Sequence, residues 1–173
     1  MRRHLQLSQC HSWTKLWFGK HRGLTLPQVM FRDSDWFFWA FQDEVFHGKG
    51  QLAIEAEEIY RKARSIHIPP VGNKRRFAEY VFHPLDGSFA NLNFVSREAA
   101  SDEGSSPAFK LGVLDMSTPF AHGRWVTKDS ARIMIDAVKH IAFGNVRCPA
   151  TKRRCEEFFE NDEHFDADAL EAK

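Results

Sequence analysis

The sequence has few cysteines and no long hydrophobic run, and both shortages exclude whole classes of protein. Its three cysteines, Cys10, Cys148 and Cys155, are too few for a disulfide framework, and their odd number fits a reducing compartment. No stretch approaches the roughly 18 uninterrupted apolar residues that a membrane helix needs. The first residues lack the apolar core of a signal peptide. We therefore expect a cytoplasmic protein that neither spans a membrane nor is secreted.

The common catalytic signatures are also missing. The sequence contains no G-x-x-x-x-G-K-[ST] phosphate loop, no G-x-G-x-x-G, no G-x-S-x-G and no H-E-x-x-H. The E-x-K spacing of restriction-type nucleases occurs only at Glu171-Ala172-Lys173, beside the C-terminus, where it cannot lie inside a core. Cys148 and Cys155 are seven residues apart, which does not match the ligand spacing of a zinc site. We expect no enzymatic activity, no metal and no cofactor.

Aromatic residues, in contrast, are abundant. The chain of 173 residues contains 16 Phe and 5 Trp, within a composition that is 43% hydrophobic and 27% charged. These proportions are typical of a soluble globular protein, and the length suits one domain of ordinary size or two small ones.

Charge is distributed unevenly, although the formal net charge is only +1. Residues 1–32 contain six Lys or Arg and no acid, whereas residues 156–173 contain eight acids and one Lys. Two further basic runs lie at 74–76 and 152–154. Such a chain can present a basic face to an anionic partner. The alternative is that both ends are simply solvated.

The local patterns predict an α+β fold that begins with a short hairpin and two helices. Residues 13–30 are expected to form two extended pieces around a turn, because Gly19 and Gly23 are four residues apart. Helices are expected over 35–46 and 51–65. The first of them is so aromatic that it is either buried, which we favour, or a surface for a partner.

Pro69-Pro70 ends this N-terminal module, so the predicted division is between residues 1–69 and 70–173. The second part is expected to contain antiparallel strands and two helices. Its predicted elements are strands at 77–82 and 89–95 around the Asp86-Gly87 turn, a mobile loop at 96–107, a strand at 109–114, a helix ending near Phe143, a last helix capped by Thr151, and an acidic C-terminal tail.

One segment carries a resemblance to a known family. Trp17-Phe18-Gly19-Lys20-His21-Arg22-Gly23, followed by Asp33 and the aromatic run that ends at Trp39, resembles the small C-terminal domain of exonuclease X-like proteins. Short uncharacterised phage and bacterial proteins share this pattern. The resemblance covers residues 17–39 only. In the exonuclease X-like proteins the catalytic acids lie in another domain and have no counterparts here, so the resemblance implies contact with nucleic acid rather than nuclease activity.

We therefore predict a non-enzymatic nucleic-acid-binding accessory protein of phage or mobile-element type, with DNA or RNA as its partner. The Gly-Lys-His-Arg-Gly turn would offer donors to phosphates, and nearby Trp side chains would stack on unpaired bases. The predicted binding residues are Lys15, Trp17, Lys20, His21, Arg22, Trp36, Lys74, Arg75 and Arg76. The structural alternative is that the glycines serve only the turn and the Trp side chains form its core.

A second hypothesis is a protein-binding inhibitor or adaptor of a host nucleoprotein complex, similar in role to an anti-CRISPR protein. Its basis is the acidic segment 156–173, which could occupy a basic nucleic-acid channel, together with the polar loop 96–107.

Overall fold

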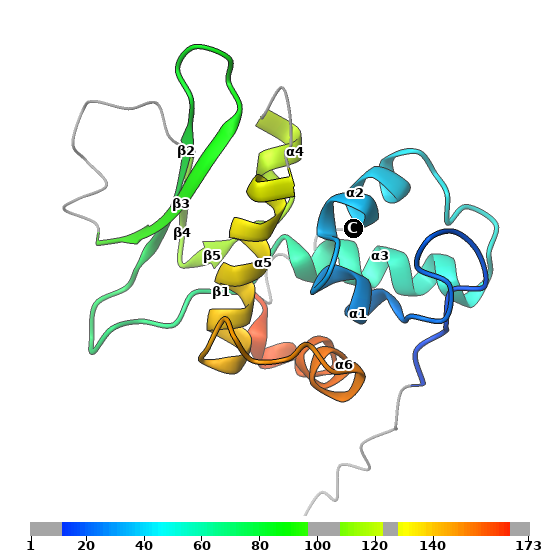
Figure 1. Cartoon of the computed structure of the whole chain (residues 1–173). Helices are drawn as coiled ribbons and strands as arrows, with labels where there is room; N and C mark the ends of the chain where they lie inside the picture. Colours follow the sequence, from blue (N-terminus) through cyan, green and yellow to red (C-terminus); the bar gives the residue numbers. More distant parts are fainter. Residues whose placement is uncertain (1–11, 97–107, 123–127, 167–173) are drawn as a thin grey trace, which may run out of the picture.

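Helices dominate the first part of the chain, and strands enter after residue 65. The computed structural model describes residues 12–96, 108–122 and 128–166. The described elements are α1 (Leu26–Met30), α2 (Ser34–Gln42), α3 (Gln51–Ala63), β1 (Ile66–His67), β2 (Phe77–Phe82), β3 (Phe89–Val95), β4 (Ala108–Leu111), β5 (Val113–Leu114), α4 (Thr118–His122), α5 (Lys128–Phe143), α6 (Lys152–Glu160) and a short 3-10 helix, Asp162–His164 (Figure 1). The predicted α+β class is confirmed.

Two small antiparallel sheets hold the strands together. β2 is the central strand of a three-stranded sheet with the order β3-β2-β4, and β1 pairs with β5. The β2–β3 hairpin turns at Asp86-Gly87 as predicted. The backbone N–H of Ser88 donates to Asp86 Oδ1 at 2.8 Å, and Gly87 adopts the positive φ that this turn requires.

The single strand predicted at 109–114 is divided in two. Gly112 has a φ of +63°, which bends the chain between β4 and β5. Its N–H donates to the Arg76 carbonyl oxygen at 3.1 Å, and its own carbonyl accepts from the Ile68 N–H at 2.8 Å. β4 therefore extends the larger sheet, whereas β5 pairs with β1.

The prediction of an extended piece at 24–30 is wrong. Residues 26–30 form helix α1, with Pro27 in its first turn, where a missing N–H does no harm. The Thr25 N–H donates to Gln28 Oε1 at 3.1 Å, which supports the start of the helix. The predicted turn before α1 is present. The Leu16 N–H donates to the Leu24 carbonyl oxygen at 2.8 Å, and Gly19 and Gly23 have positive φ angles.

The two N-terminal helices form where the sequence predicts them, but both end early. α2 ends at Gln42 instead of residue 46, because Glu44 adopts a φ of +55° that a right-handed helix cannot contain. α3 ends at Ala63 instead of residue 65. The Ser65 hydroxyl donates to the Arg61 carbonyl oxygen at 3.1 Å and closes the last turn.

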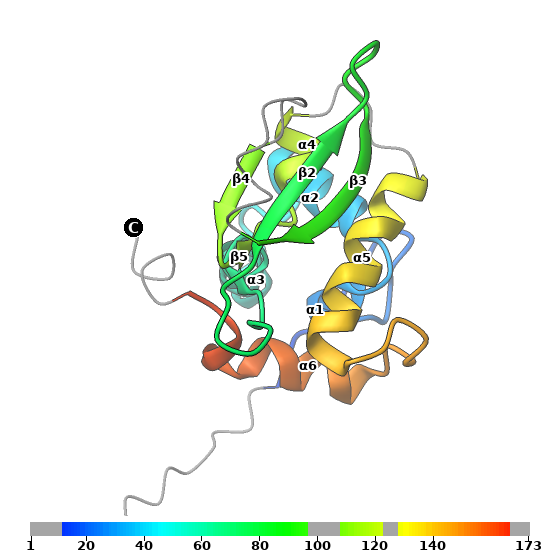
Figure 2. The same cartoon turned by 90° about the vertical axis from the view of Figure 1, so that its left-hand side faces the viewer.

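One hydrophobic cluster draws on residues from both sides of Pro69-Pro70. Phe31, after α1, stacks on Phe143 of α5 with ring centroids 4.9 Å apart and meets the edge of Phe158 of α6 at 5.5 Å. Phe37 and Phe38 of α2 are fully buried, so most of the aromatic helix belongs to the core, although Trp39 is half exposed. Figure 2 shows α5 beside β3 and α6 crossing below α1.

Buried polar side chains fasten the N-terminal segment and α6 to α3. Glu55 is fully buried, and one of its carboxylate oxygens accepts from the Thr14 hydroxyl at 2.9 Å. Lys62 is 7% exposed and lies 2.8 Å from Glu58 and 2.9 Å from Asp162. In the part of the chain that the structure describes, no helix has both the length and the apolar character needed to cross a bilayer.

The hydroxyl of Tyr80 generates a stability prediction. It donates to the Asp115 carbonyl oxygen at 3.0 Å and accepts from the Asp115 N–H at 2.8 Å, in a fully buried position. Tyr80→Phe leaves both backbone groups without this partner, so we expect the free energy of unfolding to fall by about 1–3 kcal/mol in urea denaturation. Tyr60→Phe is the control, because the Tyr60 hydroxyl has no hydrogen bond among the described residues. An equal change in both variants would contradict the prediction.

Candidate nucleic-acid interface

A groove of about 870 Å³ lies where the segment after α1, helix α5 and the start of α6 meet. Lys20 and the residues between α1 and the first turn of α2 form one wall, and one face of α5 forms the other. Its lining consists of Lys20, Phe31, Arg32, Asp33, Asp35, Ala131, Arg132, Ile135, Asp136, Lys139, Pro149, Ala150 and Thr151.

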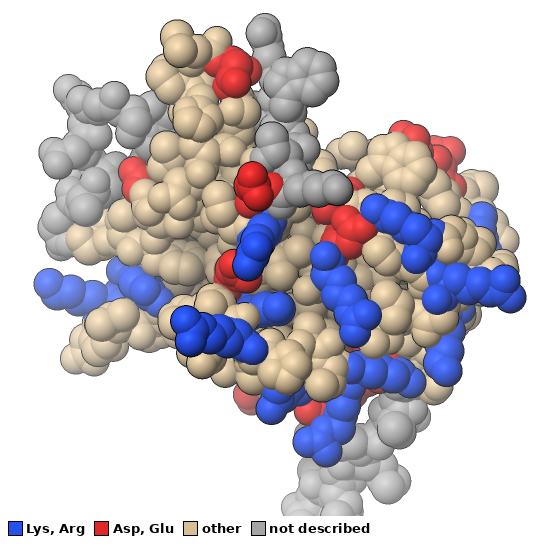
Figure 3. All heavy atoms as spheres, viewed as in Figure 1, with Lys and Arg blue, Asp and Glu red and all other residues tan. Residues whose placement is uncertain are grey.

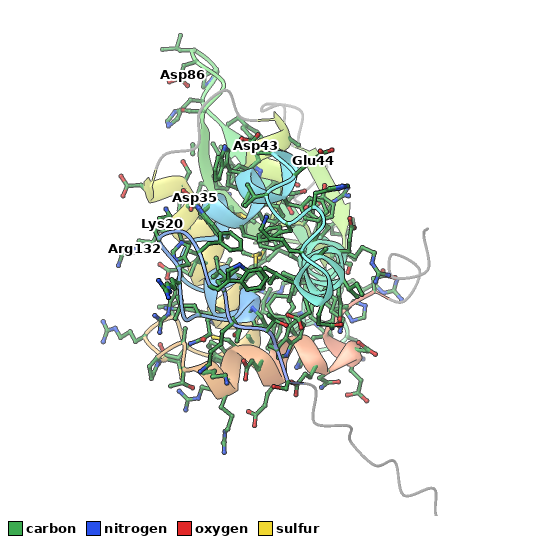
Figure 4. All side chains as sticks on the ribbon, turned by 90° about the vertical axis from the view of Figure 1, so that its right-hand side faces the viewer. Lys20, Asp35, Asp43, Glu44, Asp86 and Arg132 are labelled. Atoms are coloured by element: carbon green, nitrogen blue, oxygen red, sulfur yellow. The ribbon has the colours of Figure 1, made fainter. Side chains whose placement is uncertain are left out.

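Four cationic side chains from three separate parts of the chain line this groove. Lys20 comes from the glycine-flanked turn and Arg32 from the residues after α1. Arg132 and Lys139 are seven residues apart on α5, which places them on one helix face. Figure 3 shows Lys and Arg side chains gathered across this face of the molecule. In Figure 4, Lys20, Asp35 and Arg132 lie together at one edge.

The four cations differ in whether a carboxylate neutralises them. Lys20 Nζ lies 2.6 Å from Asp33 Oδ2, and Arg132 Nε lies 3.7 Å from Asp136 Oδ2. Within residues 12–96, 108–122 and 128–166, Arg32 and Lys139 have no ion pair. These two side chains are therefore available to an anion in the groove.

Asp33 organises the wall formed by the turn. Its Oδ2 lies 2.6 Å from Lys20 Nζ and 2.7 Å from His21 Nε2. Burial by itself raises the pKa of Asp33, but hydrogen bonds from Asp35, Lys20 and His21 outweigh burial and lower it to about 2. Burial raises the pKa of Asp35, and the adjacent Asp33 carboxylate raises it further. The turn is thus fixed against the start of α2.

No cysteine is among the residues that line the groove. Cys155 is fully buried on α6, and burial raises its pKa to about 12, against the opposing charges of Arg32 and Lys139. Among the described residues, no group of three or more His, Cys, Asp or Glu side chains could hold a metal ion. The groove therefore offers charge and shape to a ligand, and the residues that line it form no recognisable catalytic set.

The structure brings together only part of the predicted binding set. Lys15, Lys20 and Arg22 are exposed, and Trp17 on the same loop is 52% exposed. His21 is only 13% exposed and packs edge-on against Trp36, with ring centroids 4.8 Å apart. His21 and Trp36 therefore pack within the turn. For Trp36 this is the role that the structural alternative assigned to the Trp side chains.

The basic run 74–76 lies elsewhere. It belongs to the β1–β2 connection, on the opposite side of the molecule from the turn at residues 19–23 (Figures 1 and 2). Arg76 Nε donates to the Pro69 carbonyl oxygen at 3.2 Å, and its guanidinium lies over the Phe94 ring at 5.1 Å. Lys74 and Arg75 are exposed, but they cannot join the same groove.

Sequence reasoning missed three residues of the groove: Arg32, Arg132 and Lys139. The seven-residue spacing of Arg132 and Lys139 on a predicted helix was a usable signal for a shared face. No local signal indicates that this face meets Arg32, which is about one hundred residues earlier in the chain.

In comparisons with known proteins, no family model, no curated protein and no solved structure matches this chain. The resemblance of residues 17–39 to the exonuclease X C-terminal domain therefore stays a prediction, and any functional assignment depends on the geometry of the chain.

The Asp33 cluster generates a prediction with a defined pH dependence. Because Asp33 has a folded pKa of about 2 against an ordinary value of 3.8, its contribution to stability is present above pH 3.8 and is lost as the pH falls towards 2. At pH 7, Asp33→Asn is expected to lower the free energy of unfolding by about 1–2 kcal/mol, because Lys20 and His21 lose their carboxylate partner. Removal of the charge also relieves Asp35, which offsets part of the loss. Urea denaturation between pH 7 and pH 2.5 measures this difference, which should shrink in acid.

The control is Asp136→Asn, which removes a longer and more exposed ion pair on α5. We expect this variant to change the free energy of unfolding by less than about 0.5 kcal/mol at every pH. A difference between wild type and Asp33→Asn that does not vary with pH would contradict the role assigned to the Asp33 carboxylate.

Proposed function

We propose that this chain binds DNA or RNA, without enzymatic activity, as an accessory protein of phage or mobile-element type, and that the groove between residues 20–35 and α5 is its binding surface. The observation that carries the proposal is the pair Arg32 and Lys139. Both line the groove, they come from different elements, and neither has an ion pair within the described residues. Cations of this kind release counterions when they contact phosphates, which is the main source of affinity for nucleic acid.

The start of α6 adjoins the groove. Thr151 lines the groove and caps α6, and its hydroxyl oxygen accepts from the Arg154 N–H at 3.4 Å. Lys152 and Arg153 in the first turn are paired with Glu156 at 3.9 Å and Glu157 at 3.3 Å, so they add little to the charge available at this surface. On the other side, the exposed Trp17 ring lies on the same loop as Lys20 and is suited to stacking on an unpaired base.

The apolar part of the lining offers little surface to a ligand. Phe31, Ile135 and Ala150 lie among the charged residues of the groove, but Phe31 and Ile135 are only 2% and 8% exposed. The proposal therefore depends on the charged residues.

The alternative, an inhibitor or adaptor whose acidic segment 156–173 occupies a basic channel, requires acids that are available to a partner. The acids of α6 are engaged within the chain: Glu157 lies 3.3 Å from Arg153, and Glu160 accepts from the Trp13 indole at 3.0 Å. Asp162, after α6, lies 2.9 Å from the buried Lys62. The rest of the predicted acidic tail, 167–173, and the predicted loop residues 97–107 lie outside the described residues.

Fluorescence anisotropy with labelled single-stranded DNA, double-stranded DNA and RNA, at about 50 and 200 mM salt, tests the proposal. Wild type is expected to bind at low salt. Arg32→Ala/Lys139→Ala is expected to weaken binding at least about tenfold at low salt. It should also reduce the slope of log K against log salt by about 1.5, because two phosphate contacts are lost.

The matched control is Lys74→Ala/Arg75→Ala, which removes the same charge from the opposite side of the molecule. It is expected to retain most of the affinity. Equal weakening of binding by both double variants would show that net charge alone determines the affinity, and it would contradict the assignment of binding to the groove. No binding of any nucleic acid at low salt would contradict the proposed function. Circular dichroism confirms that each variant is folded.

A further inference from the structure

A second groove, of about 530 Å³, lies between the end of α2, the segment that follows it, and α3. Its lining consists of Phe41, Gln42, Glu44, Phe46, His47, Gly48, Ala53, Ile54, Ala56, Glu57 and Tyr60. In Figure 4, Asp43 and Glu44, beside this groove, lie away from Lys20 and Arg132. The two grooves are thus distinct surfaces.

The floor of the second groove is aromatic. The rings of Phe41 and Tyr60 are stacked with centroids 4.0 Å apart and an angle of 4° between their planes. Both rings are only partly buried, and the buried Phe46 ring lies beside them. Preformed aromatic surfaces of this kind bind apolar side chains at little conformational cost.

Ile54 extends the apolar surface outward. It is 62% exposed, although its neighbours Leu52 and Ala56 on α3 are fully buried. A single exposed aliphatic side chain is ordinary on a protein surface. Here, however, it continues an apolar lining that includes two partly exposed rings, which gives a contiguous patch.

The charged residues of this groove are all of one sign. Glu44 and Glu57 line it, and no Lys or Arg does. Neither carboxylate has an ion pair in the parts of the chain that the structure describes, and the same is true of the neighbouring Asp43. By contrast, Glu58 on the same helix α3 is paired with Lys62. One cation lies close by: the Arg64 guanidinium is 5.2 Å from the centroid of the Tyr60 ring, but Arg64 is not part of the lining and is paired with Asp115 at 3.5 Å. The lining itself is therefore complementary to a cationic ligand with apolar side chains.

The backbone at Glu44 closes the end of α2. Glu44 has a φ of +55°, and after it the Val45 N–H donates to the Ala40 carbonyl oxygen at 2.8 Å, as in a common helix C-terminal cap. This cap ends the helix at the groove, so Glu44 closely follows the lining residues Phe41 and Gln42.

We infer that this groove binds an amphipathic helical segment of a partner protein, with large apolar side chains on one face and Lys or Arg beside them. An apolar helix face lying in a hydrophobic groove is a common mode of peptide recognition, in which charge at the rim sets orientation and specificity. Leu or Phe side chains of the segment contact Phe41, Tyr60 and Ile54, and its cations pair with Glu44 and Glu57. The site is separate from the nucleic-acid surface, and its test does not depend on that surface.

The probe is a fluorescein-labelled peptide of about 14 residues, built from Leu and Lys at helical spacing, and its counterpart with Glu in place of every Lys. Anisotropy is expected to show binding of the Lys peptide and at least about tenfold weaker binding of the Glu peptide. Ile54→Asp is expected to weaken binding of the Lys peptide at least about tenfold. Glu57→Lys is expected to weaken binding of the Lys peptide and to strengthen binding of the Glu peptide.

The matched control is Leu85→Asp. Leu85 is 99% exposed at the β2–β3 turn, so the same kind of change is made outside the groove, and affinity should be unchanged. Because both substituted side chains are exposed, the fold is expected to persist, and circular dichroism checks it.

Three outcomes would overturn the inference. They are no binding of the Lys peptide, equal weakening by Ile54→Asp and Leu85→Asp, and equal affinity for the two peptides. A dimer of the free protein that Ile54→Asp dissociates, seen by light scattering, would also overturn it and assign the groove to a second copy of the chain.

Discussion

The ammonium group of Lys62 is the interaction on which the arrangement of the helices depends. It donates to the Phe159 carbonyl oxygen at 2.6 Å and to Glu58 Oε1 at 2.8 Å, and it forms a further ion pair with Asp162 at 2.9 Å. A buried cation is stable only with such partners. Because Lys62 holds α6 against α3, it also fixes the position of Thr151, where α6 reaches the basic groove.

The parts of the fold that could be predicted are those with strong local signals. α3 and α5 have apolar residues at helical spacing, and the Asp86-Gly87 pair specifies a tight turn. The extended piece predicted around residues 24–30 was wrong because α1 is only five residues long, too short for a period to appear. The strand predicted at 109–114 is divided at Gly112, and its two halves pair with different strands, β2 and β1. A glycine in a strand can mark such a bend, but it does not indicate which partner strand each half will have.

The candidate site was harder to predict because its geometry depends on contacts between distant segments. The glycine spacing correctly indicated the turn that displays Lys20, but not the Asp33 carboxylate that neutralises it. Packing of Phe31 against Phe143, more than one hundred residues later, brings the neighbourhood of Arg32 to α5. The run 74–76 was grouped with the turn on charge alone, and charge does not specify position. Tertiary packing, which local patterns do not encode, decides which cations share a surface.

Helix α2 connects two surfaces of opposite character. Asp35 in its first turn lines the basic groove, and Phe41 and Gln42 at its other end line the acidic, apolar groove. Its nine residues form a stiff rod of about 13 Å. Phe37, Phe38 and Ala40 in the middle of the rod are fully buried, so α2 is anchored in the core. The helix therefore sets a fixed separation between the two grooves, and a change in its length or in its packing would alter both surfaces together.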